Sequence, residues 1–138
     1  MRRDQESQGS MAIELIVLSP VIILFVLLAL AMGRFELARE QVVSAARAGA
    51  EAASVASVAG DAQSTALSVV SPDVSDQVHT CTQLSVVADT SHFIPGGFVR
   101  VTVSCQIGFT DLLIPGFPGH EVVQATVTAP IDPFRSFP

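Results

Sequence analysis

The feature that most constrains the fold of this chain is an apolar run from Leu15 to Met32, which only Ser19 and Pro20 interrupt. About 20 apolar residues are enough for an α-helix to cross the hydrocarbon core of a bilayer. The run is longer than the apolar core of a conventional secretory signal, which has roughly 7 to 15 residues. We therefore predict one membrane-spanning helix that is retained in the mature protein.

One carboxylate, Glu14, stands at the N-terminal edge of this run, five places after Gly9. An acidic side chain within a bilayer costs roughly 2.5 to 3.5 kcal/mol on insertion scales, so its presence suggests a function with a specific partner. The alternative is that Glu14 lies at the level of the lipid headgroups and marks the start of an ordinary anchor.

The segment Gly9-Ser10-Met11-Ala12-Ile13-Glu14 resembles the processing site of prepilins in the type IV filament superfamily. The closer resemblance is to TadE-like pseudopilins of tight-adherence (Tad or Flp) pilus systems. It covers most of the chain, although the C-terminal half is similar only in pattern. The residues that carry it beyond Glu14 are Pro20, Gly33-Arg34, Ala45-Ala46-Arg47-Ala48, Pro95-Gly96-Gly97, Val101 to Cys105 and Ala125 to Pro130.

The resemblance implies a mechanism of assembly. A prepilin peptidase would cut between Gly9 and Ser10, and the new amino group of Ser10 would pair with the carboxylate of Glu14 in the same or a neighbouring subunit. The implied partners are other pilin or pseudopilin subunits, the peptidase, the inner-membrane assembly platform and membrane lipid. Because the principal pilin of Tad systems is generally much shorter, we expect a minor subunit or primer of a pilus used for adhesion or DNA uptake.

The charge balance separates this chain from nucleic-acid-binding proteins. Its formal net charge is -6 over 138 residues, and no basic patch is present that could neutralise phosphates. We therefore expect no direct nucleic-acid binding. The alternative function is a single-span, membrane-anchored module that binds a partner at the cell surface without polymerising.

Two cysteines, Cys81 and Cys105, both follow the apolar run. An even number of cysteines is consistent with one disulfide in an oxidising compartment, which would place the C-terminal part outside the cytoplasm. A pair of buried free thiols is the alternative. The flanking arginines do not decide the orientation, because two precede the span and two follow it.

The alanine-rich segment after the span predicts that the helix continues. From Phe35 to about Leu67 the chain has no proline, so one helix from Ser10 to about Ser68 is the simplest interpretation, with Gly60-Asp61 as a possible earlier end. The first strong stop signal is Ser71-Pro72-Asp73. Small residues at 45, 49, 53 and 57, flanked by 46 and 50, form a stripe that either packs against other pilin helices or receives the chain's own sheet.

The remainder of the chain predicts a small antiparallel sheet. Strict alternation of apolar and polar residues marks a half-buried strand at 98–107, and the turn signal Ile94-Pro95-Gly96-Gly97 precedes it. We expect an upstream strand at about 78–88 and a third strand at 121–129, after a loop at 115–119. The face expected to be buried carries Val99, Val101, Val103, Cys105 and Ile107.

Searches for catalytic and cofactor motifs find no support for an enzyme. The segment His120-Glu121-Val122-Val123-Gln124 has glutamine where a zinc-protease helix requires its second histidine, and it lies in a strand-like region. His79, His92 and His120 have no ligand spacing, so we expect no metal site and no cofactor.

The predicted fold class is α+β, with a long N-terminal transmembrane helix that continues as an amphipathic helix, followed by a small three-stranded antiparallel sheet. The predicted organisation is a prepilin-type leader at 1–9, an anchor at 10–33, an exported helix continuation at 34–70 and a disulfide-bonded β domain at 71–138.

Overall fold

The computed structural model describes residues 3–78, 81–108 and 119–136, and within these ranges it leaves out the side chains of residues 3–12, 76 and 77. The chain divides into two compact units, Met1–Arg34 and Phe35–Pro138. The first helix, α1 (Arg3–Ser54), has residues in both units.

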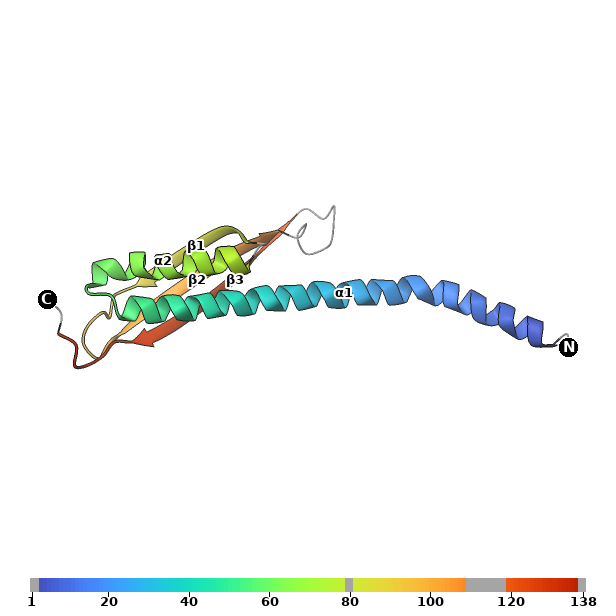
Figure 1. Ribbon diagram of the computed structural model, residues 1–138, viewed down its shortest axis with the longest axis horizontal. Coiled ribbons are helices and arrows are strands. Elements are labelled where there is room, and N and C mark those ends of the chain that lie inside the picture. The colour runs from blue at the N-terminus through green and yellow to red at the C-terminus, as the bar shows by residue number, and fades with distance from the viewer. Residues whose placement is uncertain (1–2, 79–80, 109–118, 137–138) are drawn as a thin grey trace. The chain divides into compact units, whose positions relative to one another are not determined.

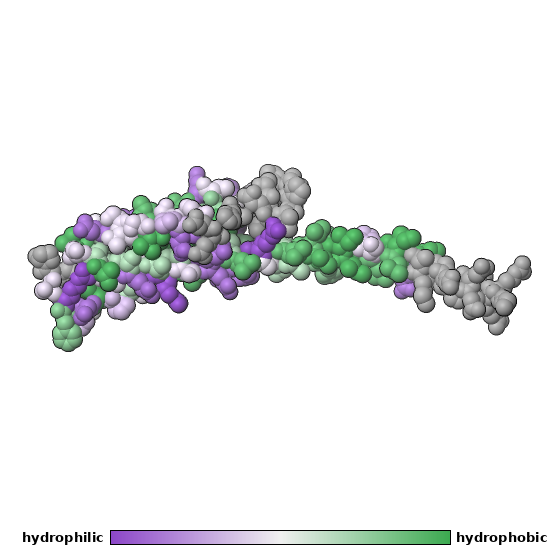
Figure 2. Space-filling model, in the orientation of Figure 1, coloured by the Kyte–Doolittle hydropathy of each residue, from purple (hydrophilic) through white to green (hydrophobic). Residues whose placement is uncertain are grey.

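The first unit consists of the N-terminal part of α1. Its side chains from Ile13 to Leu30 are all exposed, although nearly all of them are apolar, and Figure 2 shows this apolar surface on the helix. A helix that is hydrophobic on all sides is stable only inside a protein core or a membrane. In the described part of the chain, one helix is long and apolar enough to cross a membrane.

The predicted single helix is in fact two helices. Helix α1 ends at Ser54 and α2 (Ala59–Gln77) follows, so both the predicted continuation to Ser68 and the predicted stop at Ser71-Pro72-Asp73 are wrong. Valine and serine at 54–58 favour a helix less than the preceding alanines do, and Val58 adopts an extended conformation with φ -139° and ψ 158°.

Helix α2 continues through Pro72, which the sequence marked as a helix stop. An interior proline costs about 3 kcal/mol relative to alanine. Val70, Val74 and Val78 lie four residues apart and are at most 3% exposed, and burial of each such side chain contributes roughly 1.5 to 3 kcal/mol. Burial of the three valines therefore contributes more free energy than the proline costs. The helix ends where the amide of Val78 donates to the carbonyl of Val74 at 2.8 Å.

The predicted antiparallel sheet is confirmed. Its strands are β1 (Cys81–Asp89), β2 (Phe98–Gly108) and β3 (His120–Pro130), in the order β1-β2-β3. In register, Val101 pairs with both Ala88 and Val127. The turn before β2 is present, with Gly96 at φ 75°, a conformation that glycine adopts readily. The predicted loop at 115–119 lies outside the described residues except for Gly119.

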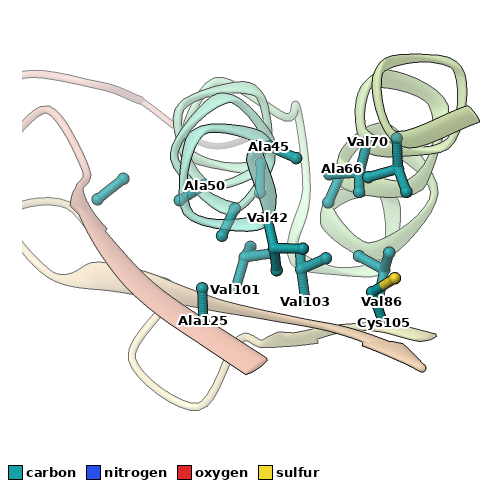
Figure 3. Close-up of a cluster of buried hydrophobic side chains, with 14 of the residues drawn as sticks. Val42, Ala45, Ala50, Ala66, Val70, Val86, Val101, Val103, Cys105 and Ala125 are labelled. Carbon is teal, nitrogen blue, oxygen red and sulfur yellow. The ribbon is translucent and has the colours of Figure 1, made fainter. Parts of the chain in front are cut away.

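Both helices of the second unit lie over the same face of the sheet (Figure 1). The predicted inner face of β2 is confirmed, because its five apolar side chains are all 0% exposed. Figure 3 shows small side chains of α1 and α2 packed above them. The core is therefore built largely from alanine and valine, and the members of this cluster drawn in Figure 3 include Val42, Ala45, Ala50, Ala66, Val70, Val101 and Val103.

The stripe of small residues on α1 belongs to this core. Ala45, Ala46, Ala50 and Ala53 are at most 1% exposed. At Gly49 an added Cβ would lie 2.6 Å from Cγ2 of Val70 and 3.5 Å from Cγ1 of Val101. Of the two interpretations of the stripe, packing within its own chain is the one the structure supports. Ser57 lies outside α1 and is exposed.

Candidate functional site

The three residues of the predicted processing and assembly site lie on α1. Gly9 and Ser10 are helical, and the surroundings of the Ser10 side chain are outside the described part of the structure. Glu14 follows Ser10 by four residues, and residues at this spacing lie on the same side of a helix, one turn apart. Ser10 and Glu14 therefore lie on the same side of α1.

Glu14 is exposed and has apolar neighbours. Ile13 is 66% and Leu15 is 68% exposed, and Leu18, one turn further on, is also exposed. Among the described residues, no hydrogen bond or ion pair involves the Glu14 carboxylate. A carboxylate in such surroundings requires either water or a cationic partner if it is to stay charged.

The predicted disulfide between Cys81 and Cys105 is present, with a Cα–Cα distance of 5.6 Å. Cys81 does not lie opposite Cys105 in register: it pairs with Ile107, and Leu84 pairs with Cys105. An irregularity between Cys81 and Gln83 shifts the register. The bond therefore holds the first residue of the edge strand β1. No residue pattern in the sequence predicts this irregularity.

Arg135 is a structural residue that the sequence analysis missed. Its guanidinium group donates hydrogen bonds to the carbonyls of Ser54, Val55 and Ala56 at 2.8, 2.7 and 2.6 Å. The last carbonyls of a helix have no partner within the helix, so Arg135 caps the C-terminal end of α1. This contact was not predictable from the sequence, because the predicted helix continued past Ser54.

A second missed contact involves the exposed edge of β1. The side-chain amide of Gln63 on α2 donates from Nε2 to the carbonyl of Val86 at 2.8 Å, and its Oε1 accepts from the amide of Ala88 at 2.6 Å. Free strand edges are templates for unwanted pairing. Gln63 therefore pairs with two backbone groups at the edge of β1.

The turn after β1 carries a carboxylate whose pKa is shifted. The amide of Ser91 donates to Oδ1 of Asp89 at 3.0 Å. Hydrogen bonds from the Ser91 backbone and side chain lower the pKa of Asp89, with smaller contributions from the charges of Arg100 and His92. The carboxylate is fully exposed, so this shift indicates a local turn contact and does not identify an ionisable catalytic group.

The described histidines form stacking and surface contacts. The ring of His92 stacks on Phe98 with 4.7 Å between centroids, and His120 begins β3 with an exposed side chain. His79 lies outside the described residues. Within the described ranges, no group of three histidine, cysteine or acidic side chains is arranged to hold a metal ion.

These features define a class of protein with one candidate membrane span near its N-terminus, followed by a small, disulfide-bonded α+β unit. A family model described as TadE-like protein matches residues 9–51. This match confirms the TadE-like resemblance over residues 9–51 and, on that basis, associates the chain with the Tad pilus machinery in general. The matched residues end three residues before α1 does, so α2 and the sheet lie outside the match. No curated protein and no solved structure matches this chain.

Proposed function

We propose that this protein is a minor pilin or pseudopilin subunit that a prepilin peptidase processes between Gly9 and Ser10 before it takes part in assembly of a Tad-type pilus. The observation that carries the proposal is the TadE-like match, which begins at Gly9 and includes Glu14. The exposed Glu14 at the edge of the apolar run from Leu15 to Met32 supports it, because a charge placed in a membrane at this position would need a partner.

Cleavage at Gly9 would supply that partner. The amino group of a new N-terminal Ser10 is cationic at neutral pH. Glu14 lies one helical turn after Ser10, on the same face of the helix. Pairing within one subunit or between two subunits would offset the cost of placing the Glu14 carboxylate in the membrane. In this proposal the disulfide-bonded unit is extracytoplasmic, the span holds the subunit in the cell membrane, and the pilus serves adhesion or DNA uptake. The protein has no catalytic role.

Two measurements test the proposal. Intact mass of the mature protein should correspond to a chain that begins at Ser10, and a chain that still begins at Met1 would contradict processing. Glu14→Gln should be produced, inserted and cleaved, but should fail to support pilus formation or to co-purify other pilins. The matched control is Leu27→Ile, which changes an exposed residue of the same span and should have no effect. Full assembly by Glu14→Gln would remove the assembly role of the acid.

One observation favours the second candidate function, a single-span surface-binding module that does not polymerise. The small-residue stripe of α1 is buried by the chain's own α2 and sheet, so it is not available for packing against other pilin helices. If pulldowns with this protein recover a surface partner but no Tad-pilus proteins, this second function would be favoured.

A further inference from the structure

The two outer edges of the sheet differ in how their backbone groups are used. At the β1 edge, Gln63 bonds to two backbone groups. Strand β3 forms the other edge, and among the described residues no hydrogen bond joins its outer side to another element. Natural edges are usually protected by lysine, an interior proline or a bulge. β3 has 11 residues in unbroken register with β2, no lysine, and a proline only at its last position. Such an edge is a template for a further strand.

The direction of each backbone group of β3 follows from its pairing with β2. The amide of Ile131 donates to the carbonyl of Gly97 at 2.9 Å, and in an antiparallel pair such bonded residues alternate with residues that point away from the partner strand. The 3.0 Å contact between the hydroxyls of Thr102 and Thr126 agrees with this alternation, because side chains of non-bonded pairs lie closer together. Pro130 has no amide hydrogen, so the outward amides are those of Val122, Gln124, Thr126 and Thr128.

Two hollows lie on the helix side of this edge, between α1 and β3. The first has a volume of about 280 Å³, and its described lining is Phe35, Arg39 and residues 122–124. The second has a volume of about 420 Å³, and its described lining is Arg47, Ala50, Glu51 and residues 127–130. Figure 3 shows α1 above the strand that carries Ala125, which lies between the two linings. We call the two hollows together the α1–β3 groove. A strand added to β3 would direct alternate side chains towards this groove.

Each hollow has one arginine on its α1 side. Arg39 and Arg47 are exposed, and among the described residues no hydrogen bond or ion pair involves either guanidinium group. Eight helical residues span about 12 Å, and four residues of an extended strand span about 13 Å. Two carboxylates four residues apart on one side of an extended segment therefore match the spacing of the arginines. Glu51 disfavours a further carboxylate at the far end of the second hollow.

We propose that an extended, acidic segment of a different protein adds to β3 as an antiparallel fourth strand, with two carboxylates at Arg39 and Arg47. In this mode of recognition the main-chain bonds provide affinity and the alternate side chains provide specificity. A second copy lacks the required pattern in its strands, because β1 and β3 have one acidic residue each and β2 has none. Membership of the partner in the pilus machinery rests on the proposed function, but the contact itself requires neither cleavage at Gly9 nor Glu14.

Hydrogen exchange of the full chain in detergent micelles tests strand addition. The probe is the peptide acetyl-Thr-Glu-Thr-Val-Thr-Glu-Thr-amide, which has two glutamates four residues apart. It should slow exchange of the four outward amides of β3 and leave the inward amides, which already bond to β2, nearly unchanged. Slow exchange of the outward amides without peptide would overturn the proposal, and dependence of that protection on protein concentration would identify a second copy as the occupant.

Two N-methylated peptides separate backbone pairing from side-chain contacts. In antiparallel pairing the threonine amides face β3 when the glutamates face α1. Methylation of the two central threonine amides should therefore abolish binding, whereas methylation of the valine and second glutamate amides should preserve it. Equal binding of the two methylated peptides would refute antiparallel strand addition. The peptide with lysine at both glutamate positions should bind at least about fivefold more weakly than the parent peptide.

Substitutions in the protein test the role of the arginines. The double variant Arg39→Gln, Arg47→Gln should bind the peptide about fivefold or more weakly. Arg100→Gln is the matched control, because Arg100 is exposed on the face of β2 away from the helices, and it should leave binding unchanged. Binding by the double variant as tight as that of the parent would contradict recognition of an acidic segment. Glu14→Gln should bind the peptide normally, so failure of this contact and failure of the Glu14 assembly role are distinguishable.

Discussion

The strongest test of the packing concerns Gly49, where α1 approaches α2 and the sheet most closely. In Gly49→Ala, the new methyl group would lie 2.6 Å from Cγ2 of Val70, about 1 Å less than a normal carbon–carbon contact. Val70 is 0% exposed, so its side chain has no free space into which it can move. Overpacking of this kind costs about 1 to 3 kcal/mol.

The higher helix propensity of alanine offsets part of this cost. Alanine is more favourable than glycine in a helix interior by about 1 kcal/mol. The net prediction for Gly49→Ala is a loss of up to about 2 kcal/mol in the free energy of unfolding. Gly60→Ala is the matched control, because nothing lies within 4 Å of the added methyl group; it should be neutral or stabilising by up to about 1 kcal/mol.

The assay is urea unfolding of the full chain in micelles, with hydrogen exchange of β2 amides as the readout for the second unit. A double substitution isolates the clash: in a Val70→Ala background, Gly49→Ala should become neutral or stabilising because the opposing methyl group is gone. If Gly49→Ala changes the free energy of unfolding by the same amount with Val70 and in the Val70→Ala background, the close approach of α1 and α2 is wrong.

Three further predictions follow from the contacts of the second unit. Arg135→Gln should lower the free energy of unfolding by about 1 to 3 kcal/mol through loss of charge-assisted hydrogen bonds to the end of α1, whereas Arg47→Gln on the exposed side of α1 should change it by less than about 0.5 kcal/mol in urea titrations. Asp89→Asn should be less stable than the parent near neutral pH; because the pKa of Asp89 is lowered by folding, this difference should disappear as pH falls through the folded pKa, and a deficit that persists in acid would contradict it. Thiol labelling of denatured, non-reduced protein should find no free thiol, and reduction should cost about 3 kcal/mol for a sequence separation of 24 residues; two labelled cysteines before reduction would rule out the bridge.

The sheet could be predicted from the sequence because its signals are local. Alternation in 98–107 has a period of two and gives the buried face directly, and β2 and β3 begin and end within one residue of the predicted limits. The break at Val55–Val58 was missed because nothing between Phe35 and Leu67 excludes a helix. It forms because the turn lets α2 bury Ala62, Ala66 and Val70 on the sheet, a gain that only tertiary structure reveals.

The candidate site was predictable to different degrees for a related reason. Glu14 is conspicuous because a charge contrasts with the apolar run around it, and Cys81 and Cys105 are the two cysteines of the chain. Arg135 and Gln63 carry no such contrast. Each acts by donating or accepting hydrogen bonds at backbone groups that are distant in sequence, and these groups depend on where α1 ends and where the edge of β1 lies.

The part of α1 before Arg34 and the part after Phe35 differ in which of their faces are exposed. This difference limits where assembly contacts can form. Residues 15–30 are nearly all apolar and are exposed on all sides of the helix, whereas after Phe35 the buried positions Ala38, Val42 and Ala45 follow a single stripe with polar residues opposite. That stripe is already covered by α2 and the sheet, and Gln63 occupies part of the β1 edge. Among the described residues, contacts between copies are therefore left to the span with Glu14 and to the exposed surface of the second unit, and the span combines a large apolar area with a single charged residue.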